Sequence, residues 1–273
     1  MVPLEVRRHL RRLPVMPFRQ TGLLTGSQPV SNGMYLSVII PAYNEEKHIK
    51  ETIESINKYL SGRNFEYEIL VVPDGSKDNT NNIVRSLLPL IPALRLLDYD
   101  KNRGKGYAVC WGMLKARGDY RLFTDADNAT TIDHIEKMMP YFEQGYDVVI
   151  GSIALEGSIV ASGSEPLWRR VFGTMGNIFI QIMAVPGIYD TQRGFKIVTA
   201  KAAEDIFPKM TIDRWGFDIE MLALARNFKY KIKEVPVNWN NDPNSHVGLN
   251  AYFQVLMETV RIRWNLWTGR YNK

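Results

Sequence analysis

The chain is organised around the segment Tyr120-Arg121-Leu122-Phe123-Thr124-Asp125-Ala126-Asp127, in which a short apolar run leads directly into two carboxylates. Side chains of an extended strand alternate between its two sides, so Asp125 and Asp127 can reach one cation only if the chain bends into a loop. Mg²⁺ and Mn²⁺ prefer oxygen ligands, share them with phosphates, and would suit such a loop. The alternative is that the pair only ends a strand, before polar residues that cap the next helix.

On the N-terminal side of this segment, apolar strands alternate with helical patterns. Strands are predicted at 35–40, 67–72 and 94–97, and the helices between them carry one apolar face, as in Ile49, Ile53, Ile56 and Leu60. This alternation predicts the α/β class, with a mostly parallel, doubly wound sheet and helices on both faces. The loops after the first, second and fourth strands should then meet beyond the carboxyl ends of the strands, where such sheets bind ligands.

The C-terminal half carries a different pattern. We predict strands at 147–150 and 231–237 and helices at 199–206, 213–225 and 252–267, the last of them basic and amphipathic. The longest uncharged stretch, 171–189, is interrupted by glycine, asparagine and proline, so it does not predict a membrane-spanning helix. We therefore expect a basic, flexible N-terminal segment at 1–33 and one domain at 34–273.

Composition narrows the function classes. The chain has 273 residues, 45% of them hydrophobic, which is enough for a sizeable core, and its net charge of +5 favours anionic partners. A single cysteine, Cys110, excludes an intramolecular disulfide framework and a zinc site built from cysteines. The basic residues are not interleaved with aromatic residues, so we expect no nucleic-acid partner.

The segment 1–33 allows three interpretations. Val6, Leu10 and Leu13 recur at helical spacing, with arginines off that face, which favours a short helix on an anionic membrane surface. The same composition is typical of a transit peptide, and a solvated tail is the third alternative.

Four motifs taken together resemble the large inverting glycosyltransferase family with a GT-A fold. They are Pro41-Ala42-Tyr43-Asn44-Glu45-Glu46, Asp74-Gly75-Ser76, Asp125-Ala126-Asp127 and Asp190-Thr191-Gln192-Arg193-Gly194-Phe195-Lys196. Within that family the chain is similar to the dolichyl- or polyprenyl-phosphate sugar synthases, and especially to the dolichyl-phosphate β-glucosyltransferase group. That narrower likeness rests on 72–80, Arg214-Trp215-Gly216-Phe217-Asp218-Ile219-Glu220 and Val235-Pro236-Val237-Asn238-Trp239, and the resemblance spans about 36–271.

The resemblance implies a nucleotide-sugar site on the first loops. Its expected contacts are Pro41, Ala42, Tyr43, Glu45, Asp74, Lys105, Asp125 and Ala126. An aromatic ring can stack on a base, and the glycine-rich basic loop at 102–106 can approach phosphates through backbone N–H groups and Lys105. Taken alone, Asp74-Gly75-Ser76 would be an ordinary turn.

The resemblance also implies a metal ion, Mg²⁺ or Mn²⁺, that neutralises the charge of the departing diphosphate. Asp127 is expected to be the direct ligand, and Asp125 to contact sugar, ribose or metal. Asn128 stands where closely similar eukaryotic proteins have glycine, and it is either a further ligand or a helix cap.

The acceptor implied by the resemblance is a lipid phosphate. Because a phosphate is already a nucleophile at neutral pH, the site needs cations to hold two anions together and no catalytic base. Arg193, beside Gln192, is the expected phosphate contact, although the eukaryotic group often has another residue there. Arg169 and Arg170 are expected to bind substrate or to face solvent or membrane, and Trp215 is a further substrate contact. The expected catalytic residues are Asp125, Asp127, Arg193 and Asp218. Asp218 could instead be an early-turn helix charge, and Glu220 stays undecided.

These expectations combine into one reaction. Glucose would pass from UDP-glucose to dolichyl or polyprenyl phosphate, with inversion, at the cytoplasmic side of a membrane to which the protein binds peripherally. The segments about 158–196 and 245–273 would form the acceptor and membrane-proximal elements. The alternatives are a mannosyltransferase that uses GDP-mannose, a transferase with a soluble acceptor, and a non-enzymatic nucleotide-sugar or nucleic-acid binding module.

Overall fold

The structure is a computed structural model that describes residues 34–159, 167–240 and 249–272. The predicted basic segment 1–33 lies outside the described residues. Arg169 and Arg170 lie on a described helix, but their side chains are outside the described part of the structure.

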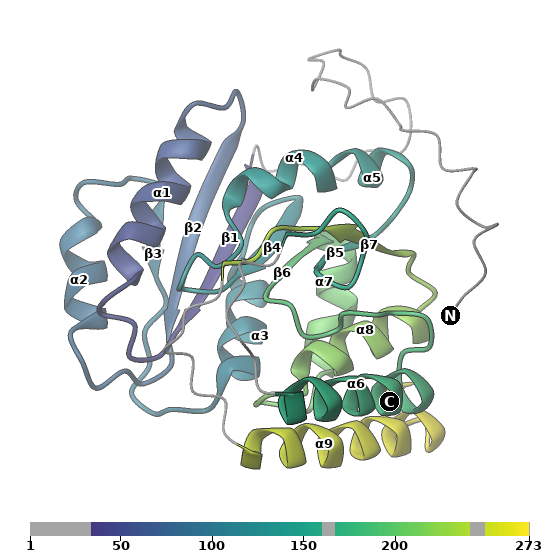
Figure 1. Cartoon of the computed structure of the whole chain (residues 1–273). Helices are drawn as coiled ribbons and strands as arrows, with labels where there is room; N and C mark the ends of the chain where they lie inside the picture. The colour runs from purple at the N-terminus through teal and green to yellow at the C-terminus, as the bar shows by residue number, and fades with distance from the viewer. Residues whose placement is uncertain (1–33, 160–166, 241–248, 273) are drawn as a thin grey trace.

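A seven-stranded sheet forms the centre of the described chain, in the order β3-β2-β1-β4-β6-β5-β7 (Figure 1). Its strands are β1 (Met34–Ala42), β2 (Glu66–Pro73), β3 (Leu94–Leu96), β4 (Tyr120–Thr124), β5 (Val148–Ser152), β6 (Phe195–Thr199) and β7 (Ile232–Pro236). All neighbouring pairs are parallel except the two that involve β6, which runs antiparallel to β4 and β5. The predicted mostly parallel α/β sheet is confirmed.

Strand β6 is the element that the sequence analysis missed. The sequence predicted no strand between 190 and 199 and a helix from Thr199, whereas Phe195–Thr199 is a strand between β4 and β5. A lysine in the middle of a short apolar run argues against a buried strand. Lys196 is nevertheless fully buried, because its ammonium group is paired with the carboxylate of Asp218 inside the protein.

Helices cover both faces of the sheet, as predicted. They are α1 (Ile49–Ser61), α2 (Thr80–Leu87), α3 (Lys105–Lys115), α4 (Ile135–Met138), α5 (Pro140–Glu143), α6 (Leu167–Met183), α7 (Ala200–Ile206), α8 (Phe217–Asn227) and α9 (Leu249–Trp267), with 3₁₀ turns at Ile132–His134, Phe207–Lys209 and Arg270–Asn272. Val38 and Ile40 of β1 pack in the core under α1, α2, α4 and α5, while Ile39 packs in the core with α3, α7 and α8. This alternation along β1 reflects the two-residue period of a strand.

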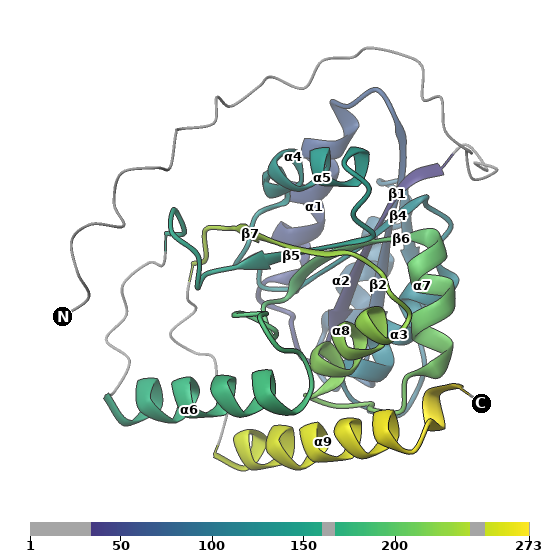
Figure 2. The ribbon, with the colours of Figure 1, turned by 90° about the vertical axis from the view of Figure 1, so that its right-hand side faces the viewer.

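Helices α6 and α9 pack against each other beneath α8, away from the sheet (Figures 1 and 2). The sequence predicted a broken stretch at 171–189, but α6 continues through Gly173 and Gly176 to Met183. A single glycine in a helix costs only about 1 kcal/mol relative to alanine, so tertiary packing can outweigh it. Within the described residues, no helix is both long enough and apolar enough to span a bilayer.

Candidate functional site

Three loops meet at the carboxyl edge of the sheet, beyond β1, β2 and β4. The backbone N–H of Asp74 donates to the carbonyl of Ala42 at 2.7 Å, which joins the first two loops. The hydroxyl of Thr52, on α1, donates to the carbonyl of Ala126 at 2.6 Å and joins the first helix to the third loop. The expected convergence of these loops is confirmed, because parallel strands place their carboxyl ends at one edge.

The loop after β1 is held in place by the loop after β2. Asn44, in the left-handed region at φ 57°, accepts a hydrogen bond from the Lys77 N–H at 2.8 Å, and its own N–H donates to the Ser76 hydroxyl at 3.1 Å. The N–H of Glu46 donates to the Asp78 carboxylate at 3.0 Å. Tyr43 therefore sits on a fixed loop, with 43% of its surface exposed and its ring available to a ligand.

Asp74 organises the glycine-rich loop. Its buried carboxylate accepts hydrogen bonds from the Tyr99 hydroxyl at 2.9 Å and from the N–H groups of Arg103 and Gly104, both at 2.7 Å. Gly104 adopts φ 111°, and a Cβ there would overlap the carbonyl of Asp213. Asp74 thus sets the path of the chain into Lys105, in addition to any contact with a base.

Lys105 reaches from the start of α3 to the end of β4. Its ammonium group lies 2.5 Å from Oδ1 of Asp125, and both side chains are about one-third exposed, at 30% and 31%. Burial alone would lower the pKa of Lys105, but the carboxylates of Asp125 and Asp218 raise it. Lys105 therefore places a positive charge beside the first aspartate of the pair.

The chain leaves its extended conformation after Thr124 and turns at Ala126 and Asp127. Strand β4 ends at Thr124, and Asn128 adopts the left-handed conformation at φ 54°. The carboxylate of Asp127 accepts a hydrogen bond from the Ala129 N–H at 3.0 Å. A cavity of about 260 Å³ opens beside it, lined by His48, Glu51, Thr52, Asp127, Asn128, Ala129, Thr131 and Asn240.

The electrostatics of this edge favour a cation. Burial and the neighbouring carboxylates of Asp127 and Asp125 raise the pKa of Glu45 to about 7, and burial together with Asp125 raises the pKa of Asp127. Among the described residues, no group of three or more His, Cys, Asp or Glu side chains is arranged to hold a metal ion. The carboxylates of Asp125 and Asp127 bring two hard oxygen donors to this edge, and such donors are of the type that a divalent ion shares with phosphates.

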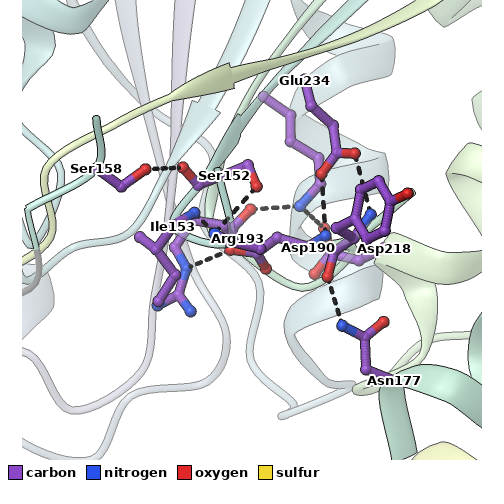
Figure 3. A network of polar contacts seen from close by, with 11 residues as sticks. Ser152, Ile153, Ser158, Asn177, Asp190, Arg193, Asp218 and Glu234 are labelled. Atoms are coloured by element: carbon purple, nitrogen blue, oxygen red, sulfur yellow. Dashed lines mark hydrogen bonds and ion pairs between the residues drawn. The ribbon is translucent and has the colours of Figure 1, made fainter. Parts of the chain in front are cut away.

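Arg193 lies two residues before β6, on the loop 189–194 that we call the Arg193 loop (Figure 3). Its guanidinium Cζ is 4.5 Å from the ring centre of Trp239, and its Nε is 3.3 Å from the carboxylate of Asp190. The same carboxylate accepts a hydrogen bond from the Ile153 N–H at 3.0 Å. Gln192 is exposed beside Arg193. The guanidinium is thus oriented by contacts with an aromatic ring and with a carboxylate.

The remaining expected residues fall on or near α8. Asp218 is 4% exposed, and its carboxylate is 2.6 Å from the ammonium group of Lys196. Trp215, two residues before the start of α8, is 39% exposed. Glu220 is buried, and its carboxylate accepts hydrogen bonds from the N–H groups of Thr211 and Ile212 and from the Tyr271 hydroxyl, so it holds structural elements together.

Comparison with known proteins identifies the family. Residues 37–207 match the model of the glycosyl transferase family 2. The chain is 38% identical to the dolichyl-phosphate beta-glucosyltransferase of Dictyostelium discoideum over 261 residues, which cover 90% of this chain and 79% of that protein. This chain belongs to glycosyl transferase family 2.

Two further comparisons extend this result for the family 2 glycosyltransferase. The dolichyl-phosphate beta-glucosyltransferase of Homo sapiens is 34% identical, over 86% of this chain and 77% of that protein. The glucosyl-3-phosphoglycerate synthase of Mycobacterium tuberculosis, solved with Mn²⁺, uridine diphosphate and phosphoglyceric acid, superposes with a TM-score of 0.60 at 17% identity, over 85% of this chain and 78% of that one. These likenesses confirm the predicted GT-A fold and the enzyme class.

Two residues near the Arg193 loop of this glycosyltransferase had no predicted role. Lys196 and Trp239 both stood within the motifs that carried the family resemblance. The signal for Lys196 was a charge inside an apolar run, which requires a buried partner if the run is a strand. Trp239 carried no such signal, because it lies on the segment that follows β7 and contacts a residue 46 positions earlier in the chain.

Proposed function

We propose that this glycosyltransferase moves glucose from UDP-glucose to dolichyl or a related polyprenyl phosphate, with inversion at the sugar carbon. The observation that carries the proposal is the similarity to dolichyl-phosphate beta-glucosyltransferases over most of both chains. The site supports it, because one sheet edge combines a carboxylate pair, a basic glycine-rich loop and an oriented arginine.

The donor half of the site follows from the loops after β1 and β2. Pro41, Ala42 and Tyr43 would line the base, with Glu45 near the ribose and Asp74 holding the loop that brings Lys105 toward the diphosphate. Asp127 would hold Mg²⁺ or Mn²⁺, with Asp125 as a second ligand or a sugar contact, together with Ala126 of the same bend. When bound, such a metal supplies positive charge that stabilises the departing diphosphate.

The acceptor half needs no general base, because a phosphate oxygen is already a nucleophile at neutral pH. Its negative charge must instead be brought close to a negatively charged donor, which requires a positioned cation. Arg193 fits this role, since Trp239 and Asp190 orient its guanidinium. Gln192 and Trp215 would line the acceptor path, with Arg169 and Arg170 as further substrate contacts.

A lipid acceptor also requires contact with a membrane surface. The α6–α9 surface, which we define by its exposed apolar side chains, comprises Met175, Ile178, Ile182, Phe253, Met257, Val260, Trp264 and Trp267. Arg261 and Arg263 are exposed on the same α9 helix. Large apolar and basic side chains on helices that do not span a bilayer favour peripheral binding at the headgroup boundary. We place this contact on the cytoplasmic side, where nucleotide sugars and anionic lipids would meet.

The deciding experiment follows labelled sugar into the organic phase. The purified protein is incubated with polyprenyl phosphate, Mg²⁺ or Mn²⁺, and either UDP-glucose or GDP-mannose. Transfer from UDP-glucose is expected, and its loss with a chelator would support the metal. Transfer from GDP-mannose and not from UDP-glucose would contradict UDP-glucose as the donor and support a mannosyltransferase. Donor hydrolysis without transfer from either donor would contradict the lipid acceptor and favour a soluble one.

A further inference from the structure

The ammonium group of Lys196 is buried behind the Arg193 loop. Its side chain is 0% exposed, and it donates to the backbone carbonyl of Arg193 and to the carboxylate of Asp218, the latter at 2.6 Å. Phe123 of β4 lies below it, with the ammonium nitrogen 5.1 Å from the ring centre. Lys196 therefore ties the loop backbone at Arg193 to helix α8.

The same loop is fixed from its other side by β7. Both oxygens of the Glu234 carboxylate accept backbone hydrogen bonds, from the N–H groups of Tyr189 and Asp190, each at 3.0 Å (Figure 3). The backbone from 189 to 193 is therefore held at both of its ends. A loop fixed in this way can present a side chain in one orientation without help from a ligand.

The far end of the loop reaches the donor site. The N–H of Asp125 donates to the carbonyl of Gly194 at 3.2 Å, and the Cα of Gly194 packs against the Asp125 carboxylate. The backbone at Arg193 and Gly194 is thus bonded both to Asp125 and to Lys196, whose ammonium group is paired with Asp218. A shift of the backbone at Arg193 would move the guanidinium relative to the proposed metal and donor.

Stability alone does not account for the buried ion pair of Lys196 and Asp218. Removing two charges from water costs several kcal/mol for each ion, and an apolar pair of similar volume is often at least as stable. Asp218 also has little access to an acceptor, because it is 4% exposed and already paired with Lys196. The geometry therefore favours a role in placing the loop over a role as a proton acceptor.

We propose that Lys196 and Asp218 are positioning residues that fix the backbone at Arg193 and thereby aim its guanidinium at the acceptor phosphate. This inference rests on the proposed function for the identity of the acceptor. It assigns Asp218 no contact with the reacting atoms. The proposal also explains why a charged residue occupies a fully buried position near the start of β6.

A double-mutant cycle tests the coupling. Lys196→Met keeps the length of the side chain and removes the ammonium group. We expect it to raise the KM for polyprenyl phosphate by about ten-fold, the usual worth of hydrogen bonds made by a charged group, while the KM for UDP-glucose stays within about two-fold. In an Arg193→Ala background, Lys196→Met should raise the KM for polyprenyl phosphate by less than about two-fold. The effects of two substitutions that act through the same side chain are not additive. Equal losses in both backgrounds would overturn the proposal.

Asp218→Asn separates positioning from proton transfer. This variant keeps the size of the side chain, so it also serves if Lys196→Met does not fold. A positioning residue predicts a raised KM for polyprenyl phosphate that disappears in the Arg193→Ala background. Loss of turnover at saturating acceptor in both backgrounds would show that Asp218 acts in the chemical step itself and would contradict our assignment.

Glu220→Gln is the matched control, because Glu220 is another buried carboxylate on α8 that lies outside the loop. It should lower the thermal midpoint and leave both KM values unchanged. Backbone hydrogen exchange across 190–194 gives a readout that needs no acceptor: it should rise in Lys196→Met and stay unchanged in Glu220→Gln. Unchanged exchange in Lys196→Met would refute positioning, whereas absence of wild-type transfer to polyprenyl phosphate would refute only the proposed acceptor.

Discussion

The Cα of Gly194 packs directly against the carboxylate of Asp125, so closely that a Cβ at position 194 would overlap both carboxylate oxygens. The backbone of the same two residues is joined by the hydrogen bond from the Asp125 N–H to the Gly194 carbonyl. The end of β4 at Asp125, in the proposed donor site, and the Arg193 loop are therefore held together directly. Any displacement of Gly194 must move the aspartate that pairs with Lys105.

Gly194→Ala is expected to lower turnover strongly without unfolding the protein. The added methyl group must displace the Asp125 carboxylate, and a displacement of about 1 Å at a reacting site can cost about a hundred-fold in rate. Initial rates and thermal midpoints measured side by side would check this. Gly62→Ala is the control, since a Cβ there meets only the Tyr59 carbonyl at 3.7 Å. A Gly194→Ala enzyme with the wild-type rate would contradict the close packing.

Asp127→Ala is expected to abolish turnover and leave the fold intact. Within the described structure its carboxylate accepts a hydrogen bond from the Ala129 N–H, and losing such a bond costs only about 1 kcal/mol. The functional loss should be far larger if the carboxylate holds the metal. Transfer rates and thermal midpoints across a Mn²⁺ titration would separate the two effects. A near-normal rate would remove Asp127 from the metal site.

Arg193→Ala is expected to weaken use of the lipid phosphate more than nucleotide binding. Truncation removes the guanidinium that Trp239 and Asp190 orient, and a charged hydrogen bond of this kind is worth about 1.5–3 kcal/mol. The measurement compares the KM for polyprenyl phosphate with the dissociation constant of UDP. Arg63→Ala removes an exposed ion pair with Glu136 and is the control. Equal losses in acceptor and nucleotide binding would exclude Arg193 from the acceptor site.

The sequence predicted the parallel part of the sheet because its strands and helices follow one another locally. Val38, Ile39 and Ile40 form a β-branched run whose alternate faces are both buried, which is the usual pattern of a parallel strand. The convergence of the loops followed from topology alone. Strand β6 could not be predicted in the same way, because it contains Lys196, whose partner Asp218 is 22 residues away.

The site was predicted as a set of residue types, and the structure adds their geometry. Asp125 and Asp127 lie at the predicted bend, and their assignment as ligands stays a prediction. The sequence contained no signal that Asp74 binds backbone N–H groups at 103 and 104, since that contact depends on how two loops pack. The contact of Arg193 with the ring of Trp239 depends in the same way on where the segment after β7 lies.

Cys110 gives a pH-dependent readout of the folded state. Burial, followed by the charges of Asp213 and Glu220, raises the pKa of its thiol from 9.0 to about 11. Since the folded pKa lies above the unfolded one, the associated stabilisation is fully present below pH 9 and is lost as the pH rises through 11. Thiolate absorbance should titrate near 11 in the folded protein and near 9 in urea. A folded midpoint near 9 would contradict the burial of the sulfur.

The α6–α9 surface predicts binding to vesicles through its aromatic end. Trp264 and Trp267 pack edge to face, with ring centres 5.4 Å apart, and are 58% and 77% exposed. Replacing both with serine removes aromatic area that a bilayer interface would bury, and should weaken binding to anionic phospholipid vesicles by about ten-fold or more. Leu90→Ser, at a 72% exposed position after α2, is the matched control and should leave binding unchanged. Sedimentation with vesicles measures both. Equal binding by the double variant and the wild type would exclude this surface as the membrane contact, and would favour an acceptor delivered in soluble form.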